Sequence, residues 1–305
     1  MLLEHRSLHA GFRARNFKRW RKALNLLETQ WVIAQEFVDE FDAKHRKEAN
    51  LLHDFQFEAL KHLHARALLV TREIICLVEG GYADGALSRW RSLHELAVVS
   101  AFLSKQDAQV AQRYLASFHF EAYRAAIQLN EYAARAKLRK FSSSELASMS
   151  ETRDLLEKRF GKGMRENYGW ASAALGKDKP NFHDMEISTG LDHWRPRYKW
   201  ASQHTHGNHR PANSLLGLSE SKQPKFLVGA SNSGFVDPLQ MTAISLNICT
   251  AAFLSTKSSI DTTIVLRILS DFAREIGPLA IRIERDSLRV AKTKSKISSE
   301  EANKQ

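Results

Sequence analysis

The chain has 305 residues, of which 43% are hydrophobic and 26% are charged. These proportions are ordinary for a globular protein and exclude a chain that is disordered over most of its length. The formal net charge is +11 and the pI is about 9.7. The surface is therefore expected to attract polyanions, among which nucleic acid is the commonest partner inside cells.

The first half of the chain is predicted to form long helices. All six prolines lie at or after Pro180, so no obligatory helix breaker interrupts the residues before it. Apolar residues recur there at spacings of three and four, which is typical of helices with one buried face. Gly80 and Gly81 supply a helix stop, and Ser142 followed by Glu145 supplies a helix start. The predicted helices cover residues 31–47, 51–79, 83–103, 107–140 and 142–160.

The second half combines helices with loop-rich segments. Residues 161–190 and 208–237 are rich in Gly, Pro, Asn and Ser, which favours short helical pieces and loops. Further helices are predicted over residues 192–207, 238–256 and 260–292. Pro196 fits the first turn of the first of these, and Gly277-Pro278 is expected to kink or split the last one. No repeat and no convincing strand is found, so the predicted fold is all-α, a bundle of long helices.

Three regions are predicted along the chain. Residues 1–50 form a basic N-terminal helical extension, residues 51–293 form a helical core domain, and residues 294–305 form a disordered basic tail.

The cysteines and the hydropathy pattern predict a cytoplasmic location. Cys76 and Cys249 lie far apart in apolar helical surroundings, which suits buried reduced thiols better than a disulfide or a zinc site. No run of about 18 uninterrupted apolar residues occurs, and the N-terminus has no secretory signal pattern. Association with a membrane is therefore not expected.

Positive charge is concentrated near the two ends of the chain. Between Arg6 and Lys22 there is no carboxylate, and aromatic residues such as Trp20 alternate with basic ones. The candidate nucleic-acid contacts are Arg13, Arg15, Lys18, Arg19, Arg21 and Lys22. A second basic stretch extends from Arg282 to Lys296. Such runs also suit a solvated helix face, and Trp20 suits either base stacking or a core position.

The first group of candidate site residues lies within the predicted helix 83–103. It consists of Arg89, Arg91, His94 and Glu95, with apolar residues around them. Arg91 and Glu95 are four residues apart, so they share a helix face and are expected to pair. Arg89 and His94 are five apart and diverge in direction. Because unpaired buried charge is costly, these groups need partners from other helices. For Arg91 and Glu95, the alternative to a catalytic or ligand-binding role is a buried ion pair that joins two or three helices. For Arg89 and His94, the alternative is a surface arginine beside a core histidine.

The second group lies in the predicted helix 192–207 and offers such partners. Tyr198, Ser202 and His206 are spaced at i, i+4 and i+8, which places a phenol, a hydroxyl and an imidazole along one helix face. A satisfied polar seam between helices is the alternative interpretation. His204, His206 and His209 form a poor metal site, because residues two apart on a helix point to different sides. No metal or other cofactor is predicted.

These two helices carry a recognisable pattern. It reads Gly81-x-x-x-Gly85-Ala86-x-x-Arg89-x-Arg91-x-x-x-Glu95 and, later, Tyr198-x-x-x-Ser202-x-x-x-His206. Over roughly residues 51–254 the chain resembles a widespread bacterial family of uncharacterised helical proteins. The helices also resemble the HEPN superfamily, whose ribonuclease members carry an Arg, four to six residues and a His. Arg89-x-x-x-x-His94 has this spacing, with Trp90 where a polar residue often follows the Arg.

The HEPN resemblance implies metal-independent RNA cleavage, commonly at a homodimer interface, in toxin or antiviral-defence roles. In that case His94 would be the general base or acid for the ribose 2′-hydroxyl, and Arg89 would stabilise the negative charge on the phosphate. The leading hypothesis is thus an RNA-binding, HEPN-like ribonuclease acting in defence or stress response. Its catalytic site would comprise Arg89, Arg91, His94, Glu95, Tyr198, Ser202 and His206. The alternatives are a non-catalytic helical module that binds nucleic acid or protein, and a small-ligand pocket.

Overall fold

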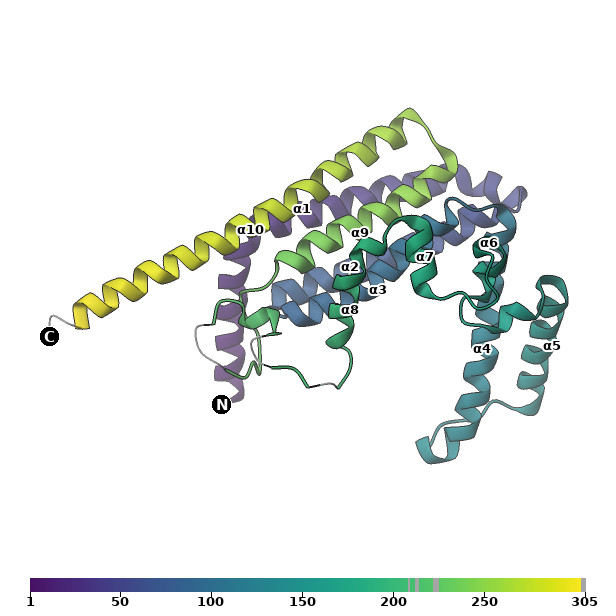
Figure 1. Ribbon diagram of the computed structural model, residues 1–305, viewed down its shortest axis with the longest axis horizontal. Helices are drawn as coiled ribbons and strands as arrows, with labels where there is room; N and C mark the ends of the chain where they lie inside the picture. Colours follow the sequence, from purple (N-terminus) through teal and green to yellow (C-terminus); the bar gives the residue numbers. More distant parts are fainter. Residues whose placement is uncertain (208, 212–213, 222–224, 303–305) are drawn as a thin grey trace.

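The computed structural model describes residues 1–207, 209–211, 214–221 and 225–302, with side chains up to residue 289. Ten α-helices and several short 3-10 helices make up most of these residues, and no strand occurs among them. The helices pack together as a bundle with a projecting arm (Figure 1). The all-α prediction is confirmed.

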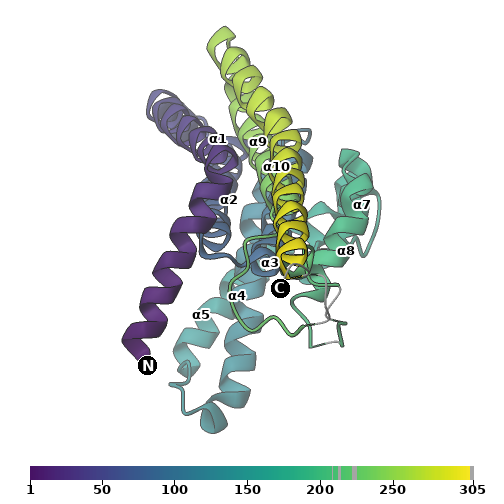
Figure 2. The same ribbon diagram turned by 90° about the vertical axis from the view of Figure 1, so that its left-hand side faces the viewer.

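Five long helices form the bundle, and the apolar helix α9 lies at its centre (Figures 1 and 2). The five are α1 (Leu2–Leu51), α2 (Phe55–Gly80), α3 (Ala83–Leu103), α9 (Val236–Leu254) and α10 (Ile260–Ala302). Helix α9 contacts each of the other four, and Leu239, Leu246 and Phe253 on it are fully buried. Within the described residues, Val236–Lys257 is the one helical segment long and apolar enough to span a membrane. Of its most apolar 18-residue stretch, 61% is buried inside the protein.

The turn between α2 and α3 is fixed by glycine, as predicted. Gly81 has φ +91°, and a Cβ there would lie 2.6 Å from Phe12 Cε1 of α1. Asn16 of α1 donates from Nδ2 to the carbonyl oxygens of Val78 at 2.8 Å and Glu79 at 3.1 Å, near the end of α2. The Val78 carbonyl also accepts the backbone N–H of Gly81, whereas Glu79 has one of the carbonyls that the end of a helix leaves open. The N-terminal part of α1 is thereby fastened to the α2–α3 turn.

A hairpin of two helices forms an arm that leaves the bundle (Figures 1 and 2). Its helices are α4 (Ala108–Ala136) and α5 (Ser143–Phe160). Asp107 caps α4, and Ser142 and Glu145 form a reciprocal capping box at the start of α5, which confirms the predicted helix start. The predicted short pieces after α5 are also present: 3-10 helices over Lys162–Arg165 and Gly169–Ala171, α6 (Ser172–Leu175) and α7 (Phe182–Thr189).

The helix predicted over residues 192–207 is shorter than expected. A 3-10 turn over Asp192–Trp194 leads into α8 (Arg195–Gln203), with Pro196 in its first turn as predicted. The helix ends at Gln203, and His204 Nδ1 then lies 3.3 Å from Asp84 Oδ1 on α3. The helix thus ends before Gly207, and the residue that follows it contacts α3.

Helix α10 is continuous through Pro278, so the predicted split does not occur. It extends to Ala302, through most of the segment for which the sequence predicts a disordered tail, and residues 303–305 lie outside the described residues. At the other end of the chain, α1 contributes Trp20, Leu24 and Leu27 to the same core as α2, α3 and α9. The division into an extension, a core and a tail stays a prediction.

Candidate functional site

Four of the predicted site residues form one network where α3 meets α8. Arg91 Nη1 lies 3.0 Å from Glu95 Oε1 on α3, as the spacing predicts. Arg91 Nε donates to Ser202 Oγ of α8 at 2.9 Å, and the Tyr198 hydroxyl donates to Glu95 Oε1 at 2.5 Å. The Arg91 guanidinium also lies over the Tyr198 ring, 4.6 Å from its centroid. We call these four side chains the α3–α8 network.

The network is internally satisfied but partly exposed. Ser202 Oγ, which accepts from Arg91, also donates to the carbonyl oxygen of Tyr198 at 2.8 Å. Burial and the neighbouring Glu95 carboxylate both raise the pKa of Tyr198, so its hydroxyl stays protonated and keeps donating. The side chains of Arg91 and Glu95 remain 32% and 33% exposed. A partly hydrated cation and anion therefore lie at the surface between α3 and α8.

His94, the neighbour of Glu95 on α3, is sealed from solvent. Its side chain is 2% exposed, and Nε2 lies 3.2 Å from Oε1 of Glu186, a fully buried residue of α7. Arg195 of α8 donates to the other oxygen of Glu186, and His183 Nδ1 lies 3.4 Å from that oxygen. Burial raises the pKa of the Glu186 carboxyl, but the hydrogen bonds from His94 and Arg195 outweigh it and hold the pKa below the ordinary 4.5. We call this the His94–Glu186 pair.

Arg89 does not share a site with His94. Its guanidinium forms an ion pair with Glu73 of α2, and Nη1 lies 3.4 Å from Ser92 Oγ. The Arg89 and Glu73 side chains are 35% and 42% exposed, whereas His94 lies in the interior. The predicted divergence of the two residues is thus confirmed. The Arg-x-x-x-x-His motif is divided between the surface and the core.

His206 lies outside the network, so the predicted row of three polar groups on one helix face is wrong. The residue follows the end of α8 in a bend and is exposed, and no hydrogen bond or ion pair joins it to another described residue. His204 is instead the buried imidazole of this segment, through its contact with Asp84. The carboxylate of Asp84 also accepts the backbone N–H groups of Leu216 at 2.9 Å and Gly217 at 3.1 Å. The start of α3 thereby anchors the loop beyond α8.

The basic residues of α1 divide into two groups. Arg19 is half-buried, forms an ion pair with Glu220 and lies over the ring of Trp20. Trp20 is fully buried and donates from Nε1 to the carbonyl oxygen of Asn232 at 2.9 Å, so it is a core residue and base stacking on it is excluded in this structure. The other candidate contacts are exposed: Arg13, Arg15, Lys18, Arg21 and Lys22.

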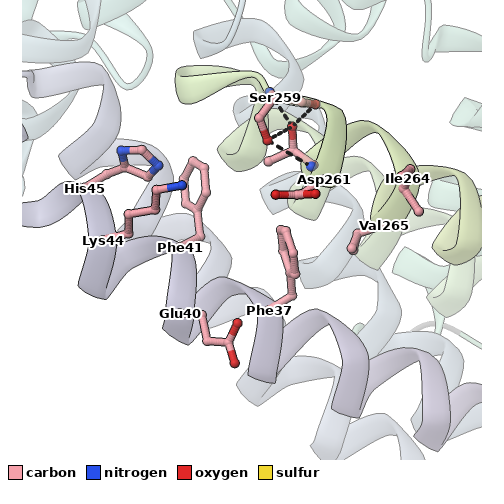
Figure 3. Close-up of a pocket in the computed structure, with 10 residues that line it drawn as sticks. Phe37, Glu40, Phe41, Lys44, His45, Ser259, Asp261, Ile264 and Val265 are labelled. Carbon is pink, nitrogen blue, oxygen red and sulfur yellow. Dashed lines mark hydrogen bonds between the residues drawn. The ribbon is translucent and has the colours of Figure 1, made fainter.

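An open cleft lies apart from both polar groups, between α1 and the start of α10 (Figure 3). Phe37 and Phe41 of α1 and Val265 of α10 provide its apolar walls. Figure 3 also shows Lys44 and Asp261 at this cleft. No predicted site residue lines it.

The arrangement at α3 favours binding or structure over catalysis. A carboxylate-paired imidazole is chemically suited to act as a base, but a base must come within hydrogen-bond reach of a substrate, and His94 is sealed. Arg91 is the accessible group, and a guanidinium can bind a phosphate or a carboxylate. Among the described residues, no three His, Cys, Asp or Glu side chains are grouped so that they could hold a metal ion.

The sequence gives no hint of the partners that matter most to His94. Glu186 and Arg195 belong to a segment of short helical pieces, where apolar periodicity is too brief to indicate which side chain turns inward. A lone carboxylate in such a piece is usually solvated. Only the long-range packing of α7 on α3 makes Glu186 a buried anion.

Comparison with known proteins yields one match. Residues 57–224 match a family described as a family of unknown function, DUF5677. The match covers more than half of the 305 residues and includes both helices of the candidate site. No curated protein matches the chain, and no solved structure does. The predicted resemblance to an uncharacterised helical family is thus confirmed, and the chain belongs to DUF5677.

Proposed function

We propose that this protein binds nucleic acid through phosphate contacts on the outer side of α1. The observation that carries the proposal is a group of exposed cations on that helix: Arg15, Lys18, Arg21 and Lys22. With 3.6 residues per turn these four fall on one side of α1, opposite the buried Trp20 and Leu24. We call them the α1 basic face.

The spacing and surroundings of the α1 basic face suit a polyanion. The four cations lie within about 10 Å along the helix, which matches the dense charge of a nucleic-acid backbone. No carboxylate lies between Arg6 and Lys22 to neutralise them. The second basic stretch contributes exposed Arg282 and Arg285 on α10, and the two chain termini lie toward the same end of the bundle in Figure 1. Positive charge from both ends of the sequence is thus available toward this end of the bundle.

The polar groups on α3 favour binding without catalysis. The α3–α8 network joins two helices through bonds that satisfy its members, and the His94–Glu186 pair is buried. Both arrangements are what a structural role requires. Contacts to phosphates position a protein on nucleic acid without reading its sequence, so we expect weak sequence preference and strong salt dependence.

The test compares two triple charge reversals by fluorescence anisotropy with labelled RNA and DNA. One variant changes Lys18, Arg21 and Lys22 of the α1 basic face to Glu. Its control changes three exposed lysines elsewhere to Glu, so that the net charge falls equally: Lys140, Lys158 and Lys162. We expect the first variant to lose affinity by about tenfold or more and its salt slope to fall by about 2 to 3, with little change in the control. Equal losses in both variants would show that only net charge matters.

A second candidate function is metal-independent RNA cleavage, which the HEPN resemblance implies, in a defence or stress-response role. The observation in its favour is the partial exposure of Arg91 beside the Tyr198 hydroxyl, since a guanidinium can hold a phosphate at a reaction site. His94 would have to become accessible before it could act as base or acid. His206 is accessible already but lies outside the network.

Cleavage is tested by incubating the purified protein with mixed RNA in EDTA. Wild type is compared with His94→Ala, His206→Ala and Arg91→Ala, each checked for folding by circular dichroism. RNA cleavage that survives chelation and is lost in a folded variant would establish the ribonuclease and identify the residue it needs. Intact RNA in every sample, together with binding, would favour the non-catalytic module.

A further inference from the structure

The outer side of helix α4 carries an apolar seam that the described part of the chain leaves largely exposed. Its members are spaced alternately four and three residues apart: Phe118, Ala122, Ala125, Leu129, Tyr132 and Ala136. This spacing is the heptad pattern with which helices pair along their length. Phe118 is 68% exposed and Tyr132 is 46% exposed, although both are large side chains.

The neighbours of α4 occupy its other sides. Helix α5 is held by Arg153, whose guanidinium lies 4.2 Å from the Tyr123 ring centroid, and by Asn130, which bonds the backbone of Phe141. Arg124 donates on another side to the carbonyl oxygen of Arg165. Tyr123 and Arg124 each lie at least about 100° around the helix from the centre of the seam. The arm projects away from the bundle in Figure 1, and the exposure of Phe118 and Tyr132 leaves the seam accessible to a partner helix.

We propose that two copies of this chain pair through α4, with the two helices antiparallel. In this arrangement every large side chain of the seam meets a small one. Phe118 faces the partner's Ala136, Tyr132 faces the partner's Ala122, and Leu129 faces the partner's Ala125. Large-against-small layers let two helices approach closely without voids. A parallel pairing would set Phe118 against Phe118 and leave facing alanines unfilled.

The charges beside the seam also favour a second copy of this chain and an antiparallel orientation. Glu121, Gln128 and Arg135 recur every seven residues along one flank of the seam. Antiparallel pairing brings Glu121 to the partner's Arg135 at both ends and places Gln128 against its own copy at the two-fold axis. Glu121 also lies 3.4 Å from Arg124, but this exposed contact leaves its carboxylate open to a second partner. The charges on this flank are therefore complementary to the charges on the same flank of an antiparallel second copy.

Charge reversal across the interface provides the first test, with mass measured by sedimentation equilibrium over a micromolar concentration series. Wild type is expected to be a dimer. Glu121→Arg or Arg135→Glu alone should weaken dimerisation by about tenfold or more, because each creates two like-charge contacts. The double variant should regain most of the wild-type affinity, which a general loss of stability could not produce. A monomeric wild type, or a double variant no better than the singles, would overturn the proposal.

Cysteine cross-linking tests the two-fold axis in a Cys76→Ser background. Gln128→Cys should form an intermolecular disulfide under mild oxidation, because the two copies of this residue meet. Ala134→Cys is the matched control, since it is also exposed on α4 but lies on the opposite side of the helix from the seam. A dimer that cross-links through position 134, or through neither position, would show that another surface pairs.

Discussion

The α3–α8 network and the His94–Glu186 pair start from neighbouring residues of α3, Glu95 and His94, yet they differ in exposure. Arg91 and Glu95 keep about a third of their side-chain surface in water, whereas His94 and Glu186 keep almost none. The first group can exchange a protein partner for a ligand or for water. The second cannot do so without moving α7 away from α3.

This difference follows from what covers each side of α3. The face that carries His94 is covered by α7, and the ring of Phe182 on α7 lies 6.0 Å from the imidazole. Arg91 and Glu95 lie where α8 crosses α3, and this helix has only one fully buried residue, Ala201. Burial rather than residue type therefore decides which of the two groups stabilises the fold and which remains accessible.

The largest effect is expected from removing the buried carboxylate. Glu186→Ala leaves His94 and Arg195 without their acceptor, which should lower the free energy of unfolding by about 3 to 5 kcal/mol. Glu95→Ala is the matched change in the α3–α8 network and should cost about 1 kcal/mol or less, because water can replace the lost bonds. Urea denaturation measures both. Equal losses of unfolding free energy in the two variants would mean that Glu186 is hydrated in solution. If Glu186→Ala fails to fold, Glu186→Gln is measured instead.

A second buried polar pair, which contains no carboxylate, extends the comparison to the pH dependence of stability. His64 is 1% exposed and its Nε2 lies 3.0 Å from Thr250 Oγ1. Burial lowers the pKa of His64 from 6.5 to about 4, so between these values the unfolded chain binds a proton that the folded chain does not. Its contribution is complete above pH 6.5 and is lost as the pH falls towards 4.

The loss of stability attributable to His64 should reach about 2 kcal/mol between pH 7.5 and pH 5. The control is His64→Leu, which removes the titrating group while Thr250 keeps its bond to the carbonyl oxygen of Leu246. Denaturant midpoints at the two pH values measure the difference. The same pH dependence in His64→Leu as in wild type would contradict the assignment to His64.

Removing the Tyr198 hydroxyl is expected to cause a smaller loss of stability. Tyr198→Phe removes the donor to Glu95 but keeps the ring under the Arg91 guanidinium, so we expect a cost of about 1 kcal/mol. Tyr82→Phe is the control, because no hydrogen bond from the Tyr82 side chain occurs among the described residues. Thermal unfolding of the two variants compares them. A cost near zero for Tyr198→Phe would show that water replaces the bond completely.

Local chemistry explains how much of the fold was predictable. Gly81 can adopt the positive φ of a helix C-cap without steric cost, and the side chains of Ser142 and Glu145 accept hydrogen bonds from each other's backbone N–H groups, so both boundaries follow from the sequence. Arg91 and Glu95 pair because helix geometry alone brings them together. Each of these features depends on residues within a few positions of one another.

The features that could not be predicted depend on contacts between distant parts of the chain. His94 meets Glu186 from a segment with little periodicity, and α8 ends early where His204 meets Asp84. Helical spacing placed His206 on the face of Tyr198 and Ser202, but that spacing holds only while the helix continues. Trp20 likewise lies in a basic sequence, and only the packing of α1 on the bundle buries it.

The smallest effect is expected from the ionic coupling between Arg91 and Glu95. A double-mutant cycle with Arg91→Gln and Glu95→Gln should give a coupling of about 0.5 kcal/mol at low salt, because both side chains are partly hydrated. The coupling should shrink as salt is raised, since water and ions screen an exposed pair. The same cycle on His94→Gln and Glu186→Gln should give a coupling several times larger and almost independent of salt. If both cycles respond to salt alike, α7 must open often enough in solution to hydrate His94, and the sealed imidazole would then be accessible to a substrate.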